Sequence, residues 1–100
     1  MEKKIFVKSQ AETKEIQDRV VLRKLLLQQV YKHHFQGNED RFSVNIQGDV
    51  EQCRNVFLAY SVLRELGYLN YAVNVHDPIQ GNLIIFPVIT VKGILEYENL

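Results

Sequence analysis

The chain has 100 residues, the length of one domain, with 46% hydrophobic and 24% charged residues, as in an ordinary globular protein. Twelve basic residues balance twelve acidic ones, which excludes a polybasic or acidic tail. The single cysteine excludes an internal disulfide framework and no apolar run is long enough to cross a bilayer, so we expect a cytoplasmic protein without membrane contact.

The longest predicted element is a helix from Gln10 to about Phe35. No glycine or proline interrupts this range, and its apolar residues recur at spacings of three and four. Ser9 and Glu12 have the spacing of a capping box, in which the serine oxygen accepts a backbone N–H. The first half of this helix is polar and is expected to project from the body. Residues 1–8 are expected to form a flexible or strand-forming arm of a single domain that spans residues 1–100.

A short strand and a second helix follow. Residues 42–47 alternate strictly between apolar and polar side chains, which predicts a half-buried strand. Gly48 and Asp49 break this pattern, and either can cap a helix that runs from about Val50 to Leu66. Gly67 then stands where a helix commonly ends in the left-handed conformation.

The last third of the chain is typical of a β-hairpin and a short helix. Residues 68–75 predict a strand that has Leu69, Tyr71, Val73 and Val75 on one face. Residues 77–82 have turn composition, and residues 83–89 predict the return strand. Proline cannot donate to a strand ladder, so Pro87 predicts an edge strand or a bulge. A final helix is expected from Thr90, as its cap, through Glu96, although Gly93 weakens it.

Two motifs carry a family resemblance. LRELGYL at residues 63–69 ends the second helix and enters the hairpin, and ITVKGIL at residues 89–95 follows the hairpin. In this order they resemble the winged helix-turn-helix superfamily of small bacterial proteins. The resemblance implies an α+β, winged-helix-like fold: a long N-terminal helix, a short strand, a second helix, a C-terminal β-hairpin wing and a short final helix.

The resemblance also implies a function. Proteins of this superfamily bind duplex DNA, and a member of this size is expected to be a transcriptional regulator that acts as a dimer. One departure from the family pattern affects this expectation. The family has a further helix before its recognition helix, whereas residues 36–49 of this chain are predicted to contain a strand. The helix-turn-helix is therefore expected to be truncated or rearranged.

The candidate DNA-contacting residues lie on three segments. On a helical wheel, the outer face of the second helix is close to neutral, because Arg54, Ser61 and Arg64 share it with two glutamates. The hairpin turn has no lysine or arginine for phosphate contacts and offers only the amides of Gln80 and Asn82. Residues 1–35, by contrast, carry eight basic and four acidic side chains, which makes the first helix the better electrostatic candidate through Arg19, Arg23 and Lys24.

The second helix also has an apolar excess. Its predicted core stripe consists of Val56, Ala59, Tyr60, Leu63 and Leu66, and Phe57 and Leu58 lie off this stripe. Two explanations stay open: either the long first helix covers these two side chains, or they form a dimer or partner surface.

Enzymatic and metal chemistry are not predicted. The soft ligand candidates are His33, His34, His76 and Cys53, and none has a metal-ligand spacing with another. Cys53 falls near the apolar face of the second helix, where a buried and inert thiol is the usual finding. No phosphate-binding glycine loop or nucleophile motif is present. We therefore expect no catalytic residues, metal or cofactor.

Three hypotheses follow from the sequence. The chain is a winged-helix DNA-binding protein, a winged-helix-like module that binds another protein without binding DNA, or a structural domain with no separable activity. The charge around the second helix and the hairpin distinguishes the first two. A neutral or acidic surface there favours protein binding, and a salt-sensitive affinity for duplex DNA favours the first.

Overall fold

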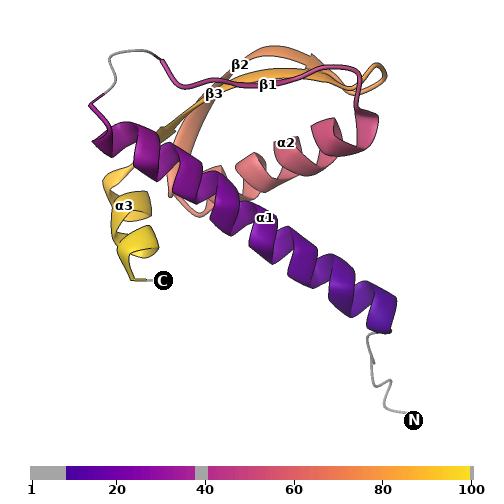
Figure 1. Cartoon of the computed structure of the whole chain (residues 1–100), viewed down its shortest axis with the longest axis horizontal. Coiled ribbons are helices and arrows are strands. Elements are labelled where there is room, and N and C mark those ends of the chain that lie inside the picture. Colours follow the sequence, from indigo (N-terminus) through magenta and orange to yellow (C-terminus); the bar gives the residue numbers. More distant parts are fainter. Residues whose placement is uncertain (1–8, 38–40, 100) are drawn as a thin grey trace.

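The computed structural model describes residues 9–37 and 41–99, and the structural statements below refer to these ranges. The expected arm, residues 1–8, lies outside them. Within them the chain is an α+β fold of three helices and one three-stranded antiparallel sheet (Figure 1). In chain order the elements are α1 (Gln10–Phe35), β1 (Val44–Ile46), α2 (Val50–Glu65), β2 (Leu69–Asp77), β3 (Asn82–Ile89) and α3 (Val91–Glu98).

Helix α1 begins and ends where the sequence predicts. The backbone N–H of Glu12 donates to the Ser9 hydroxyl at 3.1 Å, and Gly37 follows the helix with a φ of +67°. The buried side chains of α1, those of Leu26, Leu27 and Val30, all belong to its C-terminal half. The N-terminal half extends past the body of the molecule, as predicted (Figure 1).

The sheet has the strand order β1-β3-β2, with β3 in the centre. Pro87 therefore lies in a central strand, and the prediction that it marks an edge strand or a bulge is wrong. The proline is tolerated because β1 is short. Val44, at the start of β1, lies opposite Ile85, so β3 has no partner on that side at Pro87.

Strand β2 contains a bulge that the sequence pattern does not reveal. Val73 pairs with Ile85 and Val75 pairs with Ile84, which leaves Asn74 as an extra residue. The face assigned to Val75 is therefore wrong: the bulge moves this side chain to the outer face of the sheet. The bulge also turns the His76 imidazole toward α2.

Helix α3 packs against the C-terminal half of α1. The Tyr31 hydroxyl donates to a Glu98 carboxylate oxygen at 2.8 Å, and the Gln28 amide donates to the Tyr97 hydroxyl at 3.0 Å. Thr90 caps α3 as predicted, since its hydroxyl accepts from the Gly93 N–H at 3.0 Å.

The core lies between the sheet and the helices. Its fully buried side chains include Tyr60, Leu69, Leu83 and Ile85. The prediction that Leu66 belongs to the core stripe of α2 is wrong. Helix α2 ends at Glu65, so Leu66 is its C-cap residue, and the Leu66 side chain is 44% exposed. No helix in the described ranges has the length and apolar content needed to cross a membrane.

Candidate functional site

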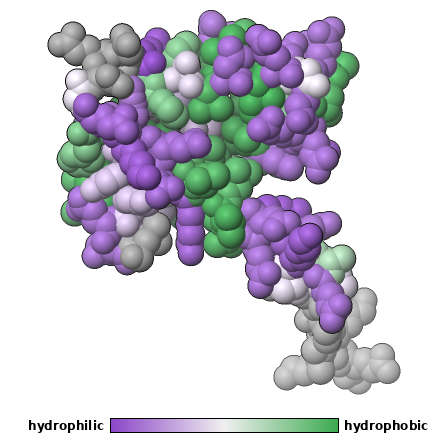
Figure 2. All heavy atoms as spheres, viewed as in Figure 1, coloured by the Kyte–Doolittle hydropathy of each residue, from purple (hydrophilic) through white to green (hydrophobic). Residues whose placement is uncertain are grey.

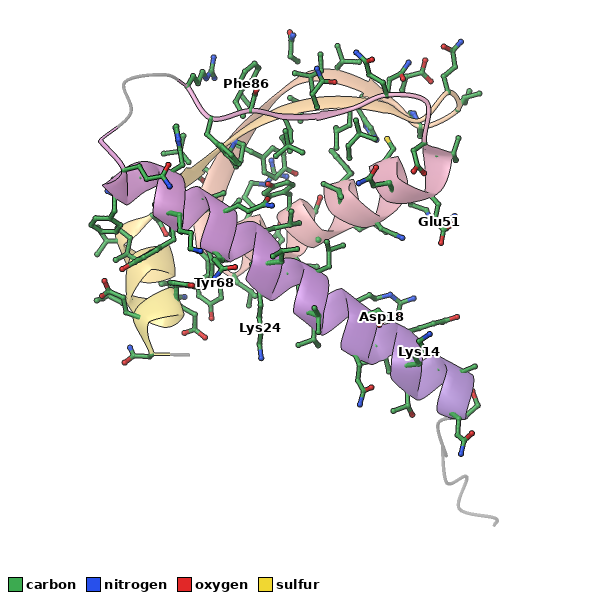
Figure 3. The ribbon with its side chains drawn as sticks, in the orientation of Figure 1. Lys14, Asp18, Lys24, Glu51, Tyr68 and Phe86 are labelled. Carbon is green, nitrogen blue, oxygen red and sulfur yellow. The ribbon has the colours of Figure 1, made fainter. Side chains whose placement is uncertain are left out.

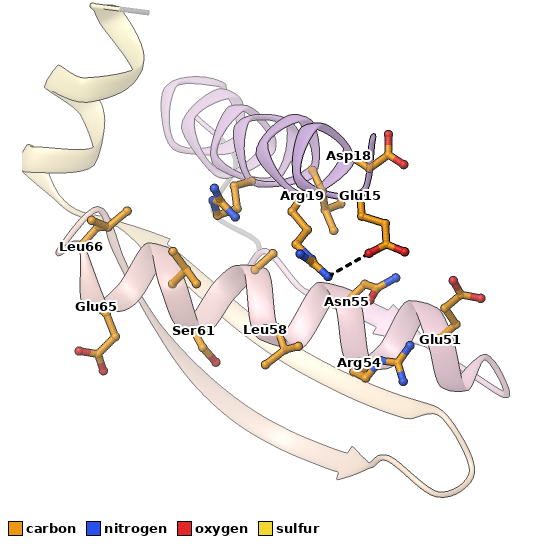
Figure 4. Close-up of a pocket in the computed structure, with 14 residues that line it drawn as sticks. Glu15, Asp18, Arg19, Glu51, Arg54, Asn55, Leu58, Ser61, Glu65 and Leu66 are labelled. Carbon is orange, nitrogen blue, oxygen red and sulfur yellow. Dashed lines mark ion pairs between the residues drawn. The ribbon is translucent and has the colours of Figure 1, made fainter. Parts of the chain in front are cut away.

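A groove separates the projecting half of α1 (residues 10–22) from the outer face of α2 (Figure 4). We call it the α1–α2 groove, and its volume is about 770 Å³. In the space-filling view the molecule is hollowed between its body and the projecting end of α1, with apolar side chains at the inner end of the hollow (Figure 2). The apolar part of the lining consists of Leu22, Leu58, Ala59, Val62 and Leu66.

The floor of the groove is a straight apolar stripe on α2. Leu58, Val62 and Leu66 follow one another at intervals of four residues, so they lie along one side of the helix. Their exposed fractions are 56%, 40% and 44%. Another side of α2 carries the buried core residues Val56, Tyr60 and Leu63. The helix is therefore apolar on two sides, and only one of them is covered.

Charged side chains surround this floor. Glu15, Asp18 and Glu51 lie toward the outer end of the groove, and Glu51 stands across its opening from Asp18 (Figures 3 and 4). A guanidinium nitrogen of Arg19 lies 3.9 Å from a Glu15 carboxylate oxygen, and both side chains are exposed. The remaining basic side chains of the lining are those of Arg23 and Arg54.

The projecting half of α1 has little support from the rest of the chain. None of its side chains is buried, and Ile16 and Val20 are only half-buried. These two residues are one turn apart and lie on the side of the helix that faces the core farther along, at Leu27. The apolar face of α1 therefore continues beyond the body that it would pack against.

The structure separates the DNA-contact candidates of α2. Arg54 and Ser61 line the α1–α2 groove. The Ser61 hydroxyl also donates to the Phe57 carbonyl at 2.9 Å and lies 3.2 Å from the Tyr71 hydroxyl. The Arg64 guanidinium instead stacks on the Tyr71 ring, 4.2 Å from its centroid. Ser61 therefore lies between the groove and Tyr71, and Arg64 lies on Tyr71 outside the groove lining.

Of the two hairpin candidates, Asn82 has a structural role through its side chain, whereas Gln80 is exposed and takes part in the turn through its backbone. The backbone N–H of Gln80 donates to an Asp77 carboxylate oxygen at 3.1 Å, which closes the turn. The side-chain oxygen of Asn82 accepts from the Gly48 N–H at 2.9 Å and ties the hairpin to the start of α2.

The basic candidates of α1 point in different directions. Arg19 and Arg23 line the groove, whereas Lys24 points away from α2 (Figure 3).

The structure gives Phe57 and Leu58 different surroundings. Phe57 is half-buried, and its ring stacks on His76 with a centroid distance of 4.0 Å. Part of the cover over Phe57 therefore comes from β2, and a role of Phe57 in a dimer or partner surface stays a prediction. Leu58 lies in the α1–α2 groove and stays mostly exposed.

Sequence reasoning missed Val62 and Leu66 as members of this surface. Their spacing from Leu58 was a usable signal, because three apolar residues at intervals of four make a stripe of their own on a helix. This stripe was overlooked because Leu66 was assigned to the core.

The described residues include no group of three or more histidine, cysteine or acidic side chains that could hold a metal ion. The His33 ring packs against Phe42, with a centroid distance of 5.1 Å. Cys53 is fully buried, with its sulfur 3.6 Å from the Asn82 carbonyl oxygen. The pKa of the Tyr60 hydroxyl is raised by burial.

The chain matches no protein-family model, no curated protein and no solved structure.

Proposed function

We propose that this chain is a winged-helix-like protein-interaction module whose α1–α2 groove binds an amphipathic helix. The observation that carries the proposal is the exposed stripe of Leu58, Val62 and Leu66 at the bottom of an open groove. Soluble monomers rarely leave contiguous apolar surface uncovered unless it binds something.

The shape of the groove favours a helix as the ligand. The stripe on α2 runs straight for about 12 Å, at 1.5 Å for each residue between Leu58 and Leu66. A helix that is apolar at every third or fourth residue matches such a stripe. The charges around the floor, with Glu51 and Arg54 on α2 and Arg19 and Glu15 on α1, can pair with polar residues that flank the apolar face of the ligand.

The winged-helix resemblance finds support in the order of the elements. A long helix, a short strand, a second helix and a hairpin follow one another, and the short strand pairs with the second strand of the hairpin. The described residues between α1 and α2 contain β1 as their regular element and no further helix. The module is therefore proposed to keep the strand and wing arrangement of that superfamily while its helix-turn-helix is incomplete.

DNA binding remains the second candidate function. The outer face of α2 would be the recognition surface, yet its centre is apolar and α1 stands over part of it. The observation that favours DNA is on α1 instead, where Lys14, Lys24 and Lys32 are exposed and Lys24 points away from α2. A contact made by these lysines would be to phosphates and would not depend on base sequence.

Selection of helical peptides tests the proposed function. A phage library of helical peptides is selected against the immobilised chain, and the enriched peptides are measured against a Leu58→Glu variant. We expect enriched sequences with apolar residues at intervals of three or four, and at least ~30-fold weaker binding to the variant, because a buried carboxylate disrupts the floor.

A matched control separates the groove from general surface hydrophobicity. Val88 is 58% exposed on the outer face of the sheet, so Val88→Glu introduces the same charge at a similarly exposed apolar site. Peptide binding is expected to survive this change. Enriched peptides that bind Leu58→Glu as well as they bind the unmodified chain contradict the proposal, and so does a failure to enrich any sequence.

Fluorescence anisotropy with mixed-sequence duplex DNA tests the second candidate. Phosphate contacts by Lys14, Lys24 and Lys32 predict an affinity that falls about tenfold or more between ~50 mM and ~200 mM salt. Changing all three lysines to glutamate is expected to abolish such binding. Absence of binding at the lower salt concentration removes this candidate.

A further inference from the structure

We infer that the helix that fills the α1–α2 groove is α1 of a second copy of this chain, in a two-fold dimer in which the two α1 helices run antiparallel. This inference rests on the proposed function of the groove and names its partner.

The chain provides both halves of the contact. The projecting half of α1 carries Ile16 and Val20 on a face that its own body does not cover, and α2 carries the exposed floor at Leu58 and Val62. A helical segment of this length with few tertiary contacts is marginal in water, so the projecting half gains stability when another surface packs against it. A two-fold contact in which each copy gives a helix and receives one is self-complementary and closed.

The order of charges along α1 fits an antiparallel pair. Among the charged residues from 12 to 24, the acidic ones come first and the basic ones follow, with Lys14 as the exception. An antiparallel arrangement places the acidic segment of one helix against the basic segment of the other, whereas a parallel arrangement places like charges together. The acidic residues are Glu12, Glu15 and Asp18, and the basic residues that follow are Arg19, Arg23 and Lys24.

The outer end of the groove offers carboxylates to such a partner. Glu15, Asp18 and Glu51 lie toward this end, with Arg19 and Arg54 beside them. The charged side chains at the inner end are those of Arg23 on α1 and Glu65 on α2. An antiparallel partner helix brings its basic segment to the carboxylates at the outer end.

The area of the contact also favours a second copy over a single bound peptide. The projecting half of α1 is about 20 Å long and roughly 10 Å wide, so one helix in one groove buries roughly 200 Å² on each surface. A two-fold dimer forms the contact twice and buries roughly 800 Å² in total, the size of a weak or transient interface. One helix in one groove buries about half of that area.

Sedimentation equilibrium of the full chain tests the inference. Between about 1 µM and about 200 µM we expect a monomer–dimer equilibrium with a dissociation constant of the order of 10 µM, typical of a small interface. Leu58→Glu is expected to weaken the dimer at least ~30-fold, and Val88→Glu to leave it unchanged. Circular dichroism checks that both variants keep their helices.

A charge exchange tests the orientation and the partner together. One variant carries Glu15→Lys and Asp18→Lys, and the other carries Arg19→Glu and Arg23→Glu. Each variant alone places like charges across the interface, so each is expected to be monomeric at the concentrations that dimerise the unmodified chain. An equimolar mixture restores opposite charges on both sides, and a heterodimer is expected. All four changes are at exposed or half-exposed positions, so folding is expected to persist.

The outcomes separate this inference from the function on which it rests. A chain that stays monomeric at the highest concentration overturns the second copy as partner. Selected peptides that still require Leu58 then leave the groove as a site for another protein. A dimer that is unaffected by both Leu58→Glu and the charge exchange overturns the inference as well, since the contact then lies elsewhere. A mixture of the two charge variants that stays monomeric contradicts the antiparallel pairing of the α1 helices.

Discussion

Gly93 is a helical glycine that has a packing function. Glycine inside a helix ordinarily costs about 1 kcal/mol relative to alanine. At this position the start of α3 lies directly on the backbone of Tyr68, and a Cβ atom would overlap the Tyr68 carbonyl oxygen and meet the Ile89 side chain at 2.9 Å. The absence of a side chain therefore lets α3 approach the end of the hairpin.

Gly93→Ala is expected to lower the free energy of unfolding by about 2 kcal/mol or more, although the same change in an open helix raises it. The physical reason is that the added Cβ atom would meet the backbone of Tyr68, which cannot move aside unless α3 is displaced. Thermal unfolding followed by circular dichroism measures the effect. Gly37→Ala is the control, since a Cβ there meets nothing within 4 Å and the strain of its φ of +67° alone costs about 1 kcal/mol. An unchanged melting temperature in Gly93→Ala would show that α3 does not rest on Tyr68.

Tyr60 carries a buried hydroxyl for which no described residue provides a hydrogen-bond partner. Tyr60→Phe keeps the ring and removes the unpartnered group, so we expect the free energy of unfolding to rise by about 1 kcal/mol. Urea denaturation followed by circular dichroism measures this change. A loss of stability would mean that the hydroxyl does have a partner, such as a bound water molecule.

The same hydroxyl predicts a dependence of stability on pH. Burial raises the pKa of Tyr60 above its ordinary value of about 10, so the folded state keeps the proton after the unfolded state has lost it. This contribution to stability is fully present below pH ~10 and is lost as the pH rises from there toward the folded-state pKa. Urea denaturation at pH values from about 8 to about 11 should show stability falling above pH ~10. The fall should be smaller in Tyr60→Phe.

The elements show how a single side chain joins distant parts of the chain. The Thr90 hydroxyl donates to the Gly67 carbonyl at 2.6 Å and accepts from the Gly93 N–H at 3.0 Å. It therefore ties the residue that follows α2 to the first turn of α3. Gly67 itself has a φ of +81°, the left-handed conformation that its place after α2 predicts.

Thr90→Val keeps the shape of this side chain and removes both hydrogen bonds. We expect a loss of about 2 kcal/mol in the free energy of unfolding, because a helix cap and a second hydrogen bond disappear together. Thr90→Ser retains the hydroxyl and is expected to lose less than about 0.5 kcal/mol. Urea denaturation of the three proteins gives the comparison, and a loss in Thr90→Ser as large as that in Thr90→Val would contradict the role given to the hydroxyl.

At the scale of the whole molecule, α1 extends beyond the hydrophobic core. Figure 1 shows α1 crossing the body and continuing past α2, and the apolar side chains of the projecting half, Ile16 and Val20, are only half-buried. If two copies cover each other, folding and association are linked, and the melting temperature depends on protein concentration.

A hundredfold rise in concentration is expected to raise the melting temperature of the unmodified chain by about 5 °C, given the unfolding entropy of two domains of this size. Differential scanning calorimetry at about 2 µM and about 200 µM measures the shift. Leu58→Glu should show a smaller dependence on concentration, and Val88→Glu should behave like the unmodified chain. A constant melting temperature in all three proteins would indicate that folding does not depend on a second copy.

Local signals in the sequence were sufficient for most of the elements. The bounds of α1, the short strand β1, the start of α2 at Asp49 and the caps at Gly67 and Thr90 depend on residues within one or two turns of each other. The sequence also predicted that the first half of α1 would project, because its polar composition leaves too few apolar side chains for burial. These features follow from backbone and side-chain chemistry that acts over short distances.

Tertiary structure alone decided which surfaces are covered. The bulge at Asn74 changed the face of Val75 and brought His76 onto Phe57, and the central place of β3 was possible only because β1 is short. The helical pattern assigned Leu66 to the core, but α2 ends before this residue, and its side chain lies in a groove with Leu58. Exposure depends on which distant segment packs against a residue, and a pattern within one segment does not contain that information.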